Sequence, residues 1–165
     1  MKLKLSLILL IIFQFANSQV KKEINRNGYQ IFYNDNLRLD ETGRNGSEFY
    51  LFTQKENAED NFAENLNLIT QNLETLNIDL NKFVEITENQ IKDNGKLIES
   101  KRGTLNGNEC QILVYEATMN GMVLKFLQYD FVQNNRAYFL TYSAKKNDFE
   151  KYFAEMEMVI KSFKI

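Results

Sequence analysis

The second half of the chain contains four strand-like segments joined by very short turns, and this pattern constrains the fold more than any other feature. The segments are residues 96–105, 109–117, 122–133 and 136–144. The turns between them are Asn106-Gly107, Asn120-Gly121 and Asn134-Asn135. Asparagine and glycine adopt the positive φ angles that two-residue hairpins require. The pattern therefore predicts four consecutive antiparallel strands.

The central strands carry apolar residues on both of their faces. In "VLKFLQYDFV", residues 123–132, Leu124 and Phe126 alternate with Leu127 and Tyr129. A strand with one face in water would carry polar residues on that face. We therefore expect further layers of structure on both sides of the sheet.

Two helices are predicted to supply those layers. Over residues 79–94 a mostly apolar stripe recurs at helical spacing, with Asp79 as the expected cap and Gly95 at the end. The stripe consists of Leu80, Phe83, Val84, Thr87 and Ile91. A second helix is predicted near the C-terminus, with Asn147 as its cap and Glu150 three residues later. Its apolar face consists of Phe149, Tyr152, Phe153, Met156, Ile160 and Phe163.

The first half of the chain is less regular. Residues 28–33 and 47–54 alternate as strands do. Between residues 56 and 77 two patterns compete. Helical steps of four and three relate Phe62, Leu66, Ile69, Leu73 and Leu76. The segment "ENLNL", residues 64–68, instead alternates polar and apolar side chains. The residues alone slightly favour a helix there.

Residues 1–18 have the features of a secretory signal peptide. Lys2 and Lys4 precede a short apolar core, and Ala16-Asn17-Ser18 supplies small residues at the −3 and −1 positions of a cleavage site. The apolar run is far shorter than the roughly 20 residues that span a bilayer. We therefore expect cleavage after Ser18 and a single mature domain, residues 19–165, in the periplasm or secreted, with no transmembrane segment.

The composition argues against several classes of function. The sequence contains no histidine, which removes the commonest general base and metal ligand. A formal net charge of −2 offers no attraction to nucleic acid. Neither a P-loop nor a dinucleotide-binding glycine motif is present. We therefore predict no catalytic residue, no metal site, no cofactor and no nucleic-acid partner.

Cys110 is the only cysteine, so it has no partner for an internal disulfide. It alternates with Ile112 and Val114 in a predicted strand, which favours a buried and unreactive thiol. An exposed thiol that pairs between two chains is the alternative.

The densest group of carboxylates lies in the segment "KENAEDNFAEN". It comprises Glu56, Glu59, Asp60 and Glu64. Oxygen ligands suit a hard cation such as calcium, but this spacing matches no coordination loop. A solvated acidic loop is the favoured interpretation. Lys145 and Lys146 are likewise expected in a solvated turn.

Several segments, taken in order, resemble the small exported bacterial proteins related to PsbP. The resemblance covers roughly residues 28–165, within a wider superfamily that includes DcrB-like proteins and a Ran-binding import factor. The segments are "DNFAENLNL", "DLNKFVEITENQIK", "ESKRG", "LKFLQYDFVQNNRAYFLTYSA", "FEKY" and "IKSFKI". The resemblance implies an α+β fold, an antiparallel sheet of about six to seven strands between helices. It also implies a strand, not a helix, at "FAENLNLITQNL".

Members of that family are mostly non-catalytic accessory or binding proteins, and the matched segments carry no catalytic residue. The resemblance therefore favours a non-enzymatic extracytoplasmic protein that binds a protein or an envelope component. A small-ligand or cation carrier is the second hypothesis, and an enzyme that uses only carboxylates is the third. For the binding surface, the sequence points to Asp60, Asn65 and Asn67. We expect the two asparagines on the polar face of a strand whose other face holds Leu66 and Leu68.

Overall fold

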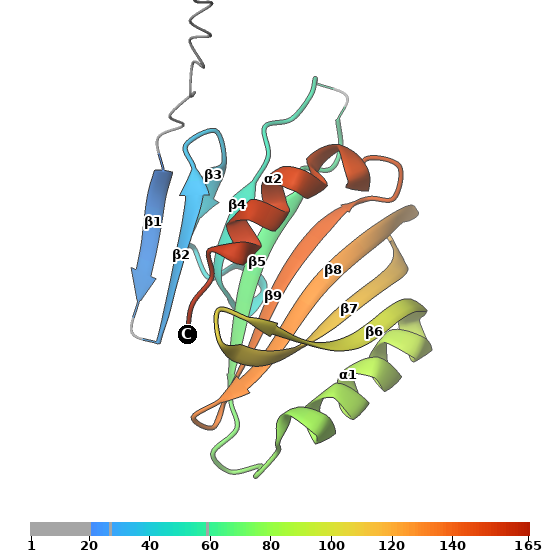
Figure 1. The fold of residues 1–165 in the computed structure, drawn as a ribbon. Coiled ribbons are helices and arrows are strands. Elements are labelled where there is room, and N and C mark those ends of the chain that lie inside the picture. Colours follow the sequence, from blue (N-terminus) through green and yellow to red (C-terminus); the bar gives the residue numbers. More distant parts are fainter. Residues whose placement is uncertain (1–20, 27, 59) are drawn as a thin grey trace, which may run out of the picture.

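The protein is an antiparallel sheet of seven strands with helices packed against it and a two-stranded sheet beside it (Figure 1). The computed structural model describes residues 21–26, 28–58 and 60–165. The large sheet contains β3 (Arg38–Asp40), β4 (Ser47–Phe52), β5 (Asn65–Asn72), β6 (Gly95–Leu105), β7 (Asn108–Met119), β8 (Met122–Gln133) and β9 (Arg136–Lys145). Their order is β3-β4-β5-β9-β8-β7-β6. The predicted α+β architecture is confirmed.

The four predicted hairpin strands are β6 to β9, each antiparallel to the next. Their turns have the backbone conformation that the sequence indicated. The φ angles of Asn106, Asn120 and Asn134 are 49°, 53° and 52°. These positive angles give the turn a twist that matches the flanking strands.

Helix α2 (Phe149–Lys161) covers one face of the sheet. Met156 and Ile160 are fully buried in one core cluster with Leu140 and Tyr142 of β9. The helix begins one residue later than predicted, because Asp148, not Asn147, occupies the N-cap position. The Asp148 N–H donates to the carbonyl of Lys145, which closes a turn directly before the helix.

Helix α1 (Leu80–Asn94) packs on the opposite face, and Figure 1 shows it at the β6 edge of the sheet. The Asp79 side chain accepts from the backbone N–H of Lys82, as predicted for a cap. The Phe83 ring lies 4.9 Å from that of Phe139, which points away from α2 because side chains alternate along a strand. Helix α1 contacts β6, β7 and β8, so neither of the two described helices lies over the β3–β5 half of this face.

Gly95 ends α1, but not through a left-handed turn. Its φ angle is −167°, and β6 begins at this residue. A Cβ atom here would lie 2.3 Å from the carbonyl oxygen of Glu116. The glycine is therefore required by the close approach of two backbones.

Residues 65–72 form a strand, as the family resemblance implied, so the helical spacing was misleading. Strand β5 pairs with β4 and β9. Leu66 and Leu68 are fully buried in the α2-side core. The four-and-three spacing includes residues in the loop before β5 and residues after β5, so it does not describe a single element. Burial between two neighbouring strands decides the structure of this segment.

The small sheet pairs β1 (Lys21–Arg26), which was not predicted, with β2 (Tyr29–Asn34). Strand β3 was not predicted either. The predicted signal peptide, including the cleavage site after Ser18, lies outside the described residues. Within the part described, neither helix is long and apolar enough to cross a membrane.

Candidate functional site

The register of the sheet lines up one row of side chains across six strands on the face that α1 leaves open. Cross-strand pairing joins Arg38, Phe52, Asn65, Ser143, Phe126 and Tyr115 in that order. The neighbouring row on the same face contains Tyr50, Asn67, Thr141 and Gln128. Residues far apart in the sequence thus form one continuous surface.

These two rows form the floor of a groove of about 720 Å³. The loop between β4 and β5 contributes Asn61, Phe62 and Ala63 to its lining. Met119 and Asn120, at the β7–β8 turn, line it as well. The volume lies within the roughly 300–1,000 Å³ that is usual for small-molecule sites.

The groove contains two pairs of stacked aromatic rings, one on β4 and one on β7 and β8. The rings of Tyr50 and Phe52 are stacked, with centroids 5.2 Å apart and an interplanar angle of 8°. The rings of Tyr115 and Phe126 are stacked at 4.6 Å and 12°. Such rings offer large, rigid contact areas that lose little conformational freedom on binding.

The floor between the aromatic pairs is made of short side chains that form hydrogen bonds. The Asn65 amide donates to the carbonyl of Ala63 at 3.0 Å. Asn67 and Ser143 are both largely buried, and their side chains make no hydrogen bond to any part of the chain that the structure describes. Neither side chain is among those with a buried polar atom that lacks a partner, so their polar atoms meet solvent in the groove and are available to a bound molecule.

All the charged side chains that line the groove, among the described residues, are cationic: Arg38, Arg44 and Lys55. The Arg38 guanidinium carbon lies 4.6 Å from the centre of the Phe52 ring, and that of Arg44 lies 5.9 Å from it. These distances are those of cation–π contacts. The β3–β4 end of the groove is therefore positively charged.

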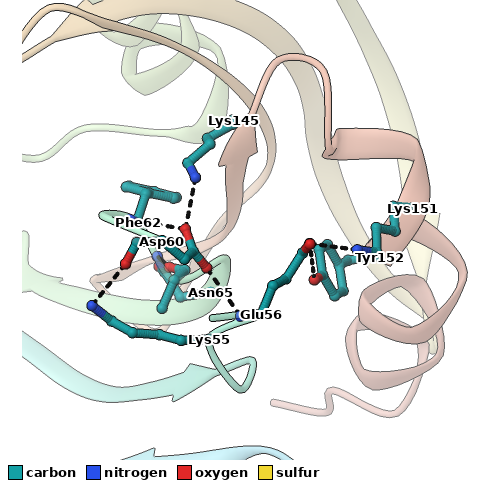
Figure 2. Close-up of polar contacts among 9 residues, drawn as sticks. Lys55, Glu56, Asp60, Phe62, Asn65, Lys145, Lys151 and Tyr152 are labelled. Carbon is teal, nitrogen blue, oxygen red and sulfur yellow. Dashed lines mark hydrogen bonds and ion pairs between the residues drawn. The ribbon is translucent and has the colours of Figure 1, made fainter. Parts of the chain in front are cut away.

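The structure brings together two of the three predicted site residues. Asn65 and Asn67 both line the groove, on the face opposite Leu66 and Leu68, although each is only 7 % exposed. Asp60 is not part of the lining. Its carboxylate accepts from Lys145 Nζ at 2.7 Å and from the backbone N–H groups of Glu56 and Phe62 (Figure 2).

Asp60 therefore organises the loop between β4 and β5 from inside. The hydrogen bond from Lys145 is the main cause that lowers the pKa of Asp60 below its ordinary value. Lys55 closes the same loop by donating to the Asp60 carbonyl at 3.0 Å (Figure 2). These contacts fix one wall of the groove.

The acidic segment is only in part the solvated loop that the sequence favoured, because residues 54–58 are exposed whereas Asp60 and Glu64 are not. Glu64 is only 2 % exposed, and burial raises its pKa. Glu56 accepts from Lys151 and from the Tyr152 hydroxyl, so lysines neutralise part of this segment. Lys146 is exposed in the turn before α2, as expected, and pairs with Glu116, whereas Lys145 is partly buried and pairs with Asp60.

No cation site is formed by this segment in the described structure. Among the described residues, which do not include Glu59, no three acidic or cysteine side chains are grouped to hold a metal ion. The attraction between Asp60 and Lys145 already satisfies the carboxylate that lies nearest to the groove wall.

A buried carboxyl lies next to the groove floor. The Tyr115 hydroxyl donates to Gln128 at 3.0 Å, and the Gln128 amide donates to Asp130 Oδ1 at 2.7 Å. Asp130 is fully buried, and its Oδ2 has no partner in the described residues. Burial raises the pKa of Asp130 to about 7.

Sequence reasoning missed the residues at the β3–β4 end of the groove. The alternation of "SEFYLFTQ" places Tyr50 and Phe52 on one face, but it does not show which strands lie beside them. Arg38 joins them only through the short strand β3, which pairs Arg38 with Phe52.

Solved structures with the same arrangement of elements identify the fold. LpqN of Mycobacterium tuberculosis, described as involved in cell envelope biogenesis, is 14 % identical with a TM-score of 0.65, over 89 % of this chain and 91 % of that one. Cyanobacterial PsbP from Synechocystis is 14 % identical with a TM-score of 0.58, over 88 % and 91 %. The chain has a PsbP-like fold.

The PsbP-like fold also occurs in PA94 of Pseudomonas aeruginosa, described as a protein of unknown function and putative regulator. Its TM-score is 0.61 at 8 % identity, over 86 % of this chain and 94 % of that one. No family model matches the sequence, and no curated protein matches it. At these identities the likeness carries the fold, not the function.

Proposed function

We propose that this PsbP-like protein is a non-catalytic, extracytoplasmic binding protein that holds a compact ligand in the groove on the α1 side of the sheet. The observation that carries the proposal is the groove floor. Asn67 and Ser143, whose side chains reach the groove and have no hydrogen-bond partner in the described chain, lie between two stacked aromatic pairs. A ligand would satisfy these polar groups and cover the rings.

The groove favours a small molecule or the head of an envelope component over a flat protein surface. Convergent polar groups at the bottom of a concavity fix the orientation of a ligand. The ion pair between Asp60 and Lys145 holds the β4–β5 loop, which forms one wall of the groove, in place. The site is therefore largely formed before binding. The signal-peptide features of residues 1–18 support an extracytoplasmic location.

Two observations support a binding role without catalysis. The sequence contains no histidine, and none of the described residues that line the groove is an aspartate or glutamate. General acid–base catalysis by side chains most often uses these residue types. The cationic lining also argues against a metal-cation carrier.

The test is native mass spectrometry of the protein after incubation with an extract of bacterial cell envelopes. The groove variant is Asn67→Leu, which removes an amide without a partner and roughly keeps the side-chain volume. The control is Gln71→Leu, the same kind of change on the exposed end of the same strand and outside the groove. We expect a bound species of defined mass in wild type and Gln71→Leu, and its loss in Asn67→Leu.

An equal amount of that species in all three proteins would contradict the proposal, because the groove would then not be the site. The absence of any bound species from the wild type would contradict it as well. Circular dichroism and thermal unfolding show whether Asn67→Leu keeps the fold.

A further inference from the structure

We propose that the groove recognises an organic anion: a phosphate or carboxylate group placed between Arg38 and Arg44, attached to a planar ring that lies along the aromatic floor. This inference rests on the proposed function and names the chemical class of the ligand. It follows from the arrangement of cations at the β3–β4 end.

The two arginines converge on one aromatic ring. Arg38 is the direct cross-strand neighbour of Phe52, and its guanidinium carbon lies over that ring, 4.6 Å from the ring centre. Arg44 approaches the same ring from the turn before β4. The carbonyl of Arg44 accepts from the Ser47 hydroxyl at 2.8 Å, which fixes this turn. Stacking holds a guanidinium by its flat face, so its N–H edge remains available.

Both guanidinium groups lack an ion-pair partner within the described residues. Other cations near the groove wall are paired, as Lys145 is with Asp60 and Lys151 with Glu56. The carboxylate of Asp40 acts on both arginines electrostatically, but its Oδ1 accepts from the backbone and hydroxyl of Thr42. Arg38 and Arg44 are therefore free to bind an external anion.

The charge of the lining contrasts with that of the whole chain. The formal net charge is −2, yet the described lining has three cations and no carboxylate. An anion entering the groove is attracted by the cations of the lining, and the Asp40 carboxylate, which lies outside the lining, opposes part of that attraction. A guanidinium fork fits the paired oxygens of a phosphate or carboxylate.

The neighbouring groups specify what is attached to the anion. Tyr50 stacks on Phe52, and the Asn45 amide donates to the Tyr50 hydroxyl at 3.3 Å, which fixes this ring next to Arg44. Phe52 is only 7 % exposed, so a planar ring bonded to the anion would stack on the half-buried Tyr50, while Asn67 offers a donor and an acceptor to polar substituents. The chemistry fits an aryl phosphate or an aromatic carboxylate.

The experiment titrates the purified protein with four probes by isothermal calorimetry: phenyl phosphate, benzoate, inorganic phosphate and benzyl alcohol. We expect the two ring-bearing anions to bind more tightly than inorganic phosphate or the neutral alcohol. Arg38→Gln and Arg44→Gln should each weaken phenyl phosphate binding about tenfold, because each removes charge-assisted hydrogen bonds. Binding should also weaken as salt is added.

The matched control is Arg136→Gln, which removes the same charge from an exposed position outside the groove and should leave binding unchanged. Arg38→Lys keeps the charge but loses the planar fork, and intermediate binding is expected. Thermal unfolding verifies that each variant is folded. Equal weakening by Arg136→Gln would overturn the inference, since only the overall charge would then matter.

A second experiment, with lipid vesicles, distinguishes a lipid headgroup from a soluble molecule as the source of the anion. Flotation with phosphatidylcholine vesicles that contain phosphatidylglycerol, lost in Arg38→Gln, would assign the anion to a lipid headgroup. Phenyl phosphate binding without such flotation would assign it to a soluble molecule. Both results support an anion site.

The two proposals fail in different ways. If benzyl alcohol binds as tightly as phenyl phosphate, and Asn67→Leu prevents binding while Arg38→Gln does not, the groove is a ligand site but not for anions. If Asn67→Leu also leaves the envelope-derived species and every probe unaffected, the proposed function itself fails.

Discussion

Lys145, the last residue of β9, holds the carboxylate of Asp60 across a sequence separation of 85 residues, with 2.7 Å between Nζ and Oδ1. This contact joins the loop between β4 and β5 to the centre of the sheet. Because that loop contributes one wall of the groove, the pair links the stability of a surface loop to the shape of the candidate site.

Replacing Asp60 with alanine should destabilise the protein by about 1–3 kcal/mol, since Lys145 and two backbone N–H groups lose their acceptor. The effect should be concentrated in the loop, where amide hydrogen exchange between residues 53 and 64 should become faster. Urea unfolding measures the first effect and exchange mass spectrometry the second. Glu56→Ala, which breaks a more exposed ion pair, is the control and should change stability little.

Acidification should weaken the same loop. The pKa of Asp60 is lowered in the folded protein, so its stabilising contribution is complete above its ordinary pKa and disappears as the pH falls through the folded value. Loop exchange rates should therefore rise on acidification in the wild type, after correction for intrinsic exchange. In Asp60→Ala they should change much less, and an equal rise in both proteins would show that another group is responsible.

Asp130 should have the opposite dependence on pH. Burial raises its pKa from 3.8 to about 7, so the folded state holds the proton more tightly than the unfolded state does. Its contribution is most favourable below pH 4 and is lost as the pH rises toward 7, by up to about 4 kcal/mol. Asp130→Asn keeps a neutral polar group there and should be more stable than wild type at pH 8, with little difference at pH 4.

Chemical denaturation at several pH values tests this prediction. The pKa of Glu64 is also raised by burial and adds a change in the same direction, so the comparison must be between variant and wild type at each pH. A destabilised Asp130→Asn at pH 8 would mean that the carboxylate has a cationic partner in solution.

The thiol of Cys110 should be unreactive in the folded protein. The residue is fully buried in the α2-side core, and burial raises its pKa to about 11. The thiolate is the reactive form, so a thiol reagent should label the native protein slowly and the urea-unfolded protein quickly. Rapid labelling of the native protein would show that the core around β7 opens readily.

The sequence by itself determined the elements whose physics is local. Asn-Gly and Asn-Asn turns fix the hairpins of β6 to β9, because the turn conformation sets the register of the strands beside it. Alternation along these strands predicted that both faces are covered at least in part, and the apolar stripes located both helices. Alternation likewise placed Asn65 and Asn67 opposite Leu66 and Leu68. The cap of α2 was misplaced by one residue, since Asn147 and Asp148 are equally suitable by type and only the turn from Lys145 selects between them.

Only the tertiary structure decided which distant residues share a site. Alternation assigns a side chain to a face, but the neighbours on that face depend on the pairing of β3, β4, β5 and β9, and no two-residue turn joins any of these strands to the next. That pairing places Arg38 beside Phe52, and Phe52 beside Asn65. It also turned Asp60 from a predicted surface residue into the partner of Lys145, because the energy of an ion pair depends on distance in space and not on separation along the chain.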